Sequence, residues 1–244
     1  MRLLITNDDG FDAPGLAQLI EVAAEFGEVF VAAPARAWSG CGHRICTDRP
    51  IEVTEPQPRR FVVDAFPADC VRLALAHLVG PVDWVLAGIN DGGNLGADVH
   101  VSGTVAAARE ASLFRVPSVA LSQYRAHQGR TAWSDSGILV RRVLEQLLRQ
   151  PLPGSLWNVN LPDVRARFAH DQWHEQIEIE NCEIDSHPLP FEYEREGELY
   201  RYSGSYHDRP RQERSDVAWC FDGRITISRL PVCGSNASHA GEGF

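Results

Sequence analysis

A strand, a helix and a second strand follow one another at the N-terminus, and this order limits the fold more than any other feature of the sequence. Leu3–Thr6 is a short apolar run that ends in the turn-forming cluster Asn7–Gly10. Pro14 suits the first turn of a helix, whose apolar residues recur at helical spacing until Gly27 ends it. Val29–Ala32 is the next strand. A helix that crosses between two such neighbouring strands makes them parallel, with a right-handed connection.

The alternation of strands and helices continues to about residue 165. Further strands are expected at Phe61–Val63, Trp84–Ala87, Val119–Leu121 and Trp157–Leu161. Helices are expected at Asp69–Leu78, Val105–Ser112 and Ile138–Leu148, the last of them capped by Ser134 or Asp135. The segment 35–58 is expected to be irregular. This pattern predicts an α/β fold with a three-layer, mostly parallel, Rossmann-like sheet.

The texture of the sequence changes after Pro162. Gln176–Glu180 alternates between polar and apolar residues, Leu199–Tyr206 resembles a strand, and Ser215–Arg229 resembles a last hairpin or strand. We therefore expect an antiparallel β appendage at the C-terminal side. The prediction is an α/β catalytic core at 1–165 and a β-rich extension at 166–244 that serves oligomerisation, both within one domain.

The charged residues exclude several classes of function. All 23 basic residues are Arg, so a P-loop lysine, a Schiff-base lysine and a lysine general base are absent. The net charge of −10 disfavours binding to nucleic-acid backbones, and no nucleic-acid duplex is expected as a partner. No apolar stretch approaches the ~20 residues of a membrane helix, and the acids that follow Leu3–Ile5 lead us to expect no signal peptide. We expect a cytoplasmic protein without a membrane partner.

Three polar clusters fall at the carboxyl ends of predicted strands, where open α/β sheets bind their ligands. They are Asn7–Gly10, Ser39–Gly40 and the Gly- and Asn-rich stretch from Asn90 to Thr104. Gly10 and Gly15 do not form the G-x-G-x-x-G fingerprint, so a dinucleotide cofactor is not expected. The convergence of these clusters predicts one site at this edge of the sheet.

Neighbouring carboxylates at Asp8 and Asp9 favour a divalent metal ion. Like charges on one turn repel each other, and a hard cation removes that cost. Mg²⁺, Mn²⁺ and Ca²⁺ prefer carboxylate, amide and hydroxyl oxygens, which Asn90 and Ser39 can complete. The alternative is that Asp8 or Asp9 only caps the following helix.

Ser102–Thr104 opens a predicted helix and could hold an anion. Backbone N–H groups and the positive end of a helix favour phosphate at such a point. Glycines nearby let the backbone approach a ligand closely; they are Gly92, Gly93, Gly96 and Gly103. The alternative is that Ser102 is an ordinary helix cap.

The segment Leu4–Gly15 closely resembles the N-terminal signature of the SurE family, the survival-protein-E nucleotidases. Further segments agree in order: Ala33–Pro34 through Ser39–Gly40, Pro67–Val71, Gly88–Val99, Ser102–Glu110, Asn158–Pro162, Ser215–Asp216 and Ile225–Ser228. The resemblance spans about residues 1–230. It implies a metal-dependent phosphatase that acts on nucleoside 5′- and 3′-monophosphates, and in some members on short polyphosphate.

The resemblance also implies the roles of individual residues. The metal ligands are expected to be Asp8, Asp9, Ser39 and Asn90, holding one divalent ion. The phosphate-binding set is expected to be Asn7, Gly40, Asn94, Ser102, Gly103 and Thr104. A homodimer or a tetramer is implied, with C-terminal segments that reach across subunits. Family members often have Ser and Thr where this chain has Arg44 and Cys46, and Tyr where it has Val101, so substrate choice is the property these positions affect.

The chemistry is expected to be direct attack by water on the phosphorus. A covalent aspartyl intermediate normally needs an Asp-x-Asp motif and a later lysine, which this chain lacks. Asp8 and Asp9 are the candidates for catalytic roles, including that of the general base. The alternatives are a phosphorylation receiver domain, a sugar-nucleotide transferase, a short-chain exopolyphosphatase, and a nucleotide-binding homologue with altered catalysis.

Overall fold

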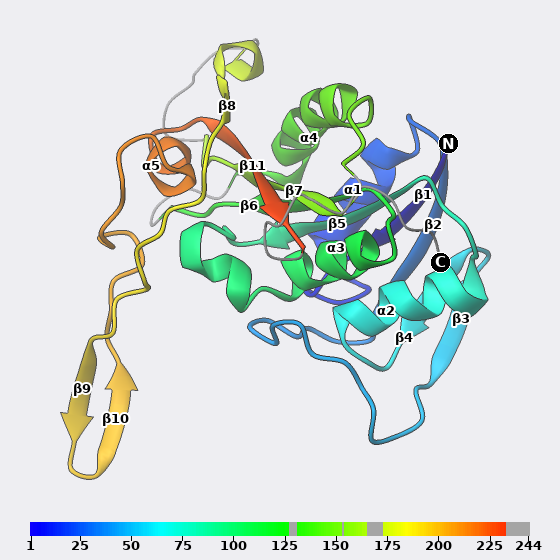
Figure 1. The fold of residues 1–244 in the computed structure, drawn as a ribbon, viewed down its shortest axis with the longest axis horizontal. Coiled ribbons are helices and arrows are strands. Elements are labelled where there is room, and N and C mark those ends of the chain that lie inside the picture. Colours follow the sequence, from blue (N-terminus) through cyan, green and yellow to red (C-terminus); the bar gives the residue numbers. More distant parts are fainter. Residues whose placement is uncertain (127–130, 153, 165–172, 233–244) are drawn as a thin grey trace, which may run out of the picture.

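A nine-stranded sheet forms the centre of the computed structural model, which describes residues 1–126, 131–152, 154–164 and 173–232. The strands lie in the order β3-β4-β2-β1-β5-β6-β7-β11-β8 (Figure 1). Their bounds are β1 Arg2–Thr6, β2 Glu28–Pro34, β3 Val53–Gln57, β4 Arg60–Val63, β5 Trp84–Asp91, β6 Ser118–Gln123, β7 Ser155–Leu161, β8 Ile179–Asn181 and β11 Ile225–Pro231. Strands β4, β2, β1, β5, β6 and β7 pair in parallel, which the crossover at the N-terminus predicted.

Helices cover both faces of the sheet. Alternate residues of a strand point to opposite faces. Leu3 and Ile5 of β1 therefore pack into the core beneath α1 (Pro14–Ala23) and α4 (Trp133–Leu147). Leu4 packs into the second core, with α2 (Pro67–Leu73) and α3 (Gly103–Leu113). The three-layer, mostly parallel α/β architecture is confirmed.

A short hairpin projects from the body of the molecule (Figure 1). Strands β9 (Tyr193–Glu196) and β10 (Leu199–Tyr202) pair antiparallel in a sheet of their own. We call residues Tyr193–Tyr202 the arm. It supplies the antiparallel appendage that the sequence predicted, although β8 and β11 join the main sheet, β11 being antiparallel to β7.

Three local expectations were wrong. Strand β3 lies inside the segment 35–58, which was expected to be irregular; it is an exposed edge strand with a register shift, so it has no apolar pattern. Helix α5 (Asp216–Phe221) occupies part of Ser215–Arg229, where a strand or hairpin was expected. Ser134 and Asp135 lie inside α4 and do not cap it. The helix begins after Ala132, where the Trp133 ring packs beside Gly15.

Smaller elements complete the fold. The helix expected over Asp69–Leu78 begins earlier, at Pro67, and continues into a π-helical turn, η1 (Ala74–Leu78). Short 3-10 helices are η2 (Gly96–His100) and η3 (Trp173–Gln176). None of the helices in the described ranges is long and apolar enough to cross a membrane.

Candidate active site

The turn after β1 places Asp8 at the carboxyl edge of the sheet. Asp8 is 4% exposed, and helix α3 holds its carboxylate. Its Oδ2 atom accepts a hydrogen bond from the Gly103 N–H at 3.1 Å, and its Oδ1 atom accepts one from the Thr104 hydroxyl. Both donors come from the first turn of an 11-residue helix, whose positive end favours a carboxylate. The side chain of Asp8 is therefore fixed in one orientation.

We call the turn after β1, which carries Asp8 and Asp9, the acid turn. Close contact between α3 and this turn depends on Gly103. A Cβ atom at this position would lie 2.8 Å from the Asp8 Cβ and 2.8 Å from the Cys41 Sγ. Ser102 precedes it as the N-cap, and its Oγ atom accepts the Val105 N–H at 3.0 Å. The capping role that was one alternative for Ser102 is thus present, and no acceptor within the described ranges takes its hydroxyl proton.

Asp9 is half-buried beside Asp8 and more accessible. Its Oδ2 atom accepts a hydrogen bond from the Asp91 N–H at 3.0 Å. Burial, and then the nearby Asp8 carboxylate, raise the pKa of Asp9 to about 6. Burial also raises the pKa of Asp8, against the lowering effect of its bonds from Thr104 and Gly103. Holding both acids ionised at this point costs free energy, which a bound cation would offset.

Asn90 lies near the end of β5, where the pairing with β6 is irregular. Its Nδ2 group donates to the Gly92 carbonyl at 2.8 Å. Since the amide nitrogen is used in this way, Oδ1 is left as an acceptor, and no donor within the described ranges bonds to it. An amide oxygen with this freedom suits a hard cation.

The loop that carries Ser39 and Gly40 is attached to the acid turn. The Trp38 N–H donates to the Asp8 carbonyl at 2.7 Å, and the Gly42 N–H donates to the Val101 carbonyl at 2.8 Å. Ser39 and Gly40 are exposed between these two attachments. The loop therefore presents both residues beside Asp8 and the start of α3.

Asn94 is held by two strands that the chain adds much later. Its backbone N–H donates to Asn160 Oδ1 at 2.7 Å, and its carbonyl accepts from the Nδ2 groups of Asn158 and Asn160 at 2.9 and 3.1 Å. Its own Nδ2 donates to Ser122 Oγ at 2.7 Å. Sequence reasoning did not assign this supporting role to Asn158, Asn160 and Ser122. Buried amides on alternate positions of a strand were the available signal.

Asn7 and Thr104 face inward. Asn7 donates through Nδ2 to the Gly10 carbonyl at 2.8 Å, and its Oδ1 atom is buried without a hydrogen-bond partner. Thr104 is fully buried, and its hydroxyl is engaged by Asp8. In this arrangement Thr104 positions Asp8, and a phosphate contact from Thr104 is not available through its hydroxyl.

The donor set fits a divalent cation of the hard type. The described ranges contain no group of three or more His, Cys, Asp and Glu side chains that could hold a metal. The predicted set instead combines two carboxylates, Asp8 and Asp9, with the neutral oxygens of Asn90 and Ser39. The raised pKa values of the two acids and the free Asn90 Oδ1 atom are the observations that support the fit.

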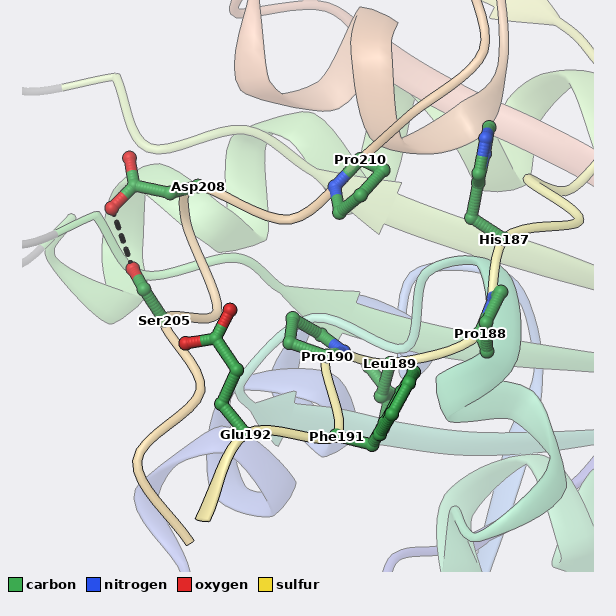
Figure 2. Close-up of a pocket in the computed structure, with 9 residues that line it drawn as sticks. All are labelled: His187, Pro188, Leu189, Pro190, Phe191, Glu192, Ser205, Asp208 and Pro210. Atoms are coloured by element: carbon green, nitrogen blue, oxygen red, sulfur yellow. Dashed lines mark hydrogen bonds between the residues drawn. The ribbon is translucent and has the colours of Figure 1, made fainter. Parts of the chain in front are cut away.

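A separate pocket lies at the base of the arm (Figure 2). It has a volume of about 590 Å³ and is lined by His187, Pro188, Leu189, Pro190, Phe191, Glu192, Ser205, Asp208 and Pro210. Asp208 accepts a hydrogen bond from the Ser205 hydroxyl at 2.7 Å. None of the predicted site residues lines this pocket, so it is separate from the site around Asp8 and Asp9, which we call the acid site.

The chain is similar to proteins of one family over most of its length. The family model described as Survival protein SurE matches residues 3–182. The 5′-nucleotidase SurE of Geotalea uraniireducens is 42% identical over 168 residues, which cover 68% of this chain and 67% of that protein. The 5′-nucleotidase SurE of Paramagnetospirillum magneticum is 34% identical over 238 residues, which cover 96% of this chain and 90% of that protein. The crystal structure of the SurE protein from Aquifex aeolicus superimposes with a TM-score of 0.82 at 26% identity, covering 97% of this chain and 95% of that one.

Proposed function

Because the chain belongs to the SurE family, we propose that it is a 5′-nucleotidase, a phosphomonoesterase that hydrolyses nucleoside 5′-monophosphates to nucleoside and phosphate. The proposal includes nucleoside 3′-monophosphates as substrates. The observation that carries it is the buried Asp8 carboxylate, held by Gly103 and Thr104 beside the more accessible Asp9. Such a pair at the carboxyl edge of a parallel sheet suits phosphate chemistry.

We further propose that the reaction depends on one divalent metal ion, Mg²⁺, Mn²⁺ or Ca²⁺. Asp8, Asp9, Ser39 and Asn90 would hold it. When bound, it would neutralise phosphate charge and make an attacking water more acidic. Asp8 is oriented for this role before any ligand arrives, because two donors of α3 fix both of its carboxylate oxygens.

The phosphate would be held by neutral groups around the acid turn. Gly40 would contact the phosphate through its exposed backbone, and Ser102 would donate a hydrogen bond through its hydroxyl group. Asn94, which Asn160 and Ser122 hold in place, lies on the neighbouring loop. Asp8 takes the Gly103 N–H and the Thr104 hydroxyl, so Gly103 and Thr104 would act through the positive end of α3, and Asn7 would act from the turn after β1. Donors fixed in this way stabilise charge that develops on phosphate oxygens.

Asp9 is the better candidate for the general base. Both carboxylate oxygens of Asp8 accept hydrogen bonds from α3, whereas the Oδ1 atom of Asp9 receives none from the described residues. Asp9 Oδ1 would accept the proton of the attacking water, and the leaving nucleoside oxygen would take up a proton from solvent. Positioning within hydrogen-bonding reach is the first requirement for this role.

We also propose a cytoplasmic homodimer, with a tetramer as the alternative assembly. All five cysteines in the described ranges are free, as is usual in a reducing compartment. The arm and Phe191, two residues before it, expose large apolar side chains; Phe191 is 85% exposed and Leu199 is 73% exposed. Exposed apolar groups of this size are typical of an interface.

The test is phosphate release from a panel of nucleoside 5′- and 3′-monophosphates, with Mn²⁺, with Mg²⁺ and with chelator. The Asp8→Asn variant is expected to reduce release by at least ~100-fold, since it removes a charge that the transition state needs. Asp12→Asn, an exposed aspartate on the same loop, is the matched control and should keep wild-type activity. Release that persists in chelator or in Asp8→Asn would contradict the mechanism, and no release with any metal would contradict the function.

A further inference from the structure

Two arginines near the acid turn differ from the other stacked arginines of the chain. The Arg36 guanidinium lies 4.3 Å from the centre of the Trp38 ring, and the Arg44 guanidinium lies 4.6 Å from that of Phe66. The other arginines that stack on rings also make an ion pair or a hydrogen bond. Arg36 and Arg44 have neither within the described ranges. Both are exposed, so their N–H groups are open to a ligand.

The two arginines and the two rings form a continuous series of contacts, in which the Trp38 and Phe66 rings are tilted by 54°. The Trp38 and Phe66 ring centres are 4.4 Å apart, and Phe66 is only 7% exposed at the start of α2. We call these four residues, Arg36, Trp38, Phe66 and Arg44, the arginine ladder. Stacking on a ring restricts a guanidinium and leaves its edges free to donate. The charges are therefore held in place without being neutralised.

The arginine ladder lies against the acid site. The backbone N–H of Trp38 donates to the Asp8 carbonyl at 2.7 Å. The backbone of Arg36 also lies close to Gly10, since a Cβ atom added to Gly10 would be 3.1 Å from the Arg36 carbonyl carbon. Arg44 lies two residues after Gly42, whose N–H donates a hydrogen bond to the Val101 carbonyl just before α3. A substrate phosphate at Asp8 and Asp9 would therefore lie beside the loop that carries Arg36, Trp38 and Arg44.

We propose that the arginine ladder is a second anion subsite, which binds a further phosphate group of the substrate. It would give the enzyme a preference for nucleotides with two separate phosphates, such as nucleoside 3′,5′-bisphosphates, over monophosphates. This inference rests on the proposed nucleotidase function. Binding of a phosphate is favoured over stacking of a nucleotide base on Trp38 or Phe66. The guanidinium groups of Arg36 and Arg44 already cover one face of each ring, and their N–H edges are free to donate hydrogen bonds. Such edges bind phosphate oxygens in pairs.

The test measures binding without turnover. Phosphonate analogues of 5′-AMP and of adenosine 3′,5′-bisphosphate, with methylene in place of the ester oxygens, are titrated calorimetrically with Mg²⁺. We expect the bisphosphate analogue to bind the wild type at least ~10-fold more tightly, the effect of one charge-assisted hydrogen bond or more. The Arg36→Gln/Arg44→Gln variant should bind both analogues equally. Arg149→Gln, an exposed arginine after α4, should behave like the wild type.

The outcomes separate the two proposals. Equal binding of both analogues by the wild type, or a preference that survives in Arg36→Gln/Arg44→Gln, would overturn the second subsite. Arg36→Lys/Arg44→Lys should restore part of the preference, because it returns the charge without the planar group. Phosphate release from 5′-AMP is measured in parallel. Its absence would count against the nucleotidase alone, since the analogues report binding independently of hydrolysis.

Discussion

Asp8 and Asp9 are neighbours in the sequence, but their surroundings give them different tasks. Asp8 is buried, and α3 holds both of its carboxylate oxygens. Asp9 is half-buried and uses one oxygen to accept the Asp91 N–H. The first is suited to fixed ligation, and the second to exchange of a proton or of a ligand.

Replacing Asp9 should stabilise the protein when no metal is bound. The pKa of Asp9 is raised to about 6, so its ionised form is disfavoured in the folded state. The free energy of unfolding therefore falls as the pH rises from 3.8, the pKa of Asp9 in the unfolded chain, through about 6, its pKa in the folded protein. In chelator at pH 7.5, Asp9→Asn should raise the free energy of unfolding by ~1 kcal/mol after allowance for solvent screening.

Urea unfolding at pH 7.5 and at pH 4 measures this effect. The increase in the free energy of unfolding caused by Asp9→Asn should be present at pH 7.5. It should be nearly absent at pH 4, where the Asp9 carboxyl of the folded wild type is largely protonated. Asp12→Asn is the control at both pH values. Added Mg²⁺ should stabilise the wild type and leave Asp9→Asn little changed. A variant less stable than the wild type in chelator at pH 7.5 would contradict this account.

Much of the candidate site could be predicted from the sequence, because its residues follow strands that the apolar pattern reveals. Asp8, Ser39 and Asn90 each come just after, or at the end of, such a strand. The fixed orientation of Asp8 by Thr104 could not be predicted, since it depends on how closely α3 approaches at Gly103. The support of Asn94 by Asn160 likewise joins residues 66 positions apart.

Helix α5 connects the end of the chain to the loop beside the site. Asp216 is fully buried, and its Oδ2 atom accepts the Gly96 N–H at 2.8 Å. Its Oδ1 atom accepts the N–H groups of Asp185 and Val217, each at 2.8 Å. One carboxylate thus joins α5, the segment before the arm and η2.

Asp216→Asn should destabilise the protein by ~2 kcal/mol, because an amide group offers one acceptor oxygen where three N–H donors need partners. The urea midpoint should fall with an unchanged m-value. Activity should also fall, because Gly96 lies two residues from Asn94. Glu213→Gln, an exposed acid in the same segment, is the control and should leave both properties unchanged. A variant as stable as the wild type would show that solvent or another group replaces the lost acceptor.

The elements that the sequence did not predict share a cause. Strand β3 is exposed along most of its length, so burial imposes no alternation on it. Helix α5 has six residues, too few for a helical repeat to be distinct from a strand. The buried strands β1, β5 and β6 were predicted well, since a strand covered on both faces contains a continuous apolar run.

The arm changes how the whole molecule meets its surroundings. Among the described residues its two strands pair only with each other, and its apolar side chains are open to solvent. Tyr193, Leu199 and Tyr200 are 60%, 73% and 65% exposed. The Pro-rich pocket at its base lies on the same segment (Figure 2). This surface is the one that we propose to contact a second copy of the chain.

We propose a dimer for the full chain, and replacing residues 192–203 by two glycines should then yield a monomer, as measured by light scattering. The circular dichroism of the core should change little, because the arm forms a separate sheet. Glu194→Gln/Glu196→Gln, which retains the arm and its apolar residues, should keep the wild-type mass. An unchanged mass after the replacement would place the interface elsewhere.

The hydrogen bonds to Asn94 and Gly96 have a consequence for how the protein is made. The acid turn follows the first strand, and Gly103, which holds Asp8, is translated 95 residues later. The loop opposite it stays unfastened until Asn158, Asn160 and then Asp216 have been translated. A nascent chain can therefore carry all the parallel strands from β1 to β7 and still lack the hydrogen bond between Gly96 and Asp216, so this loop is fully held only after Asp216 has been made.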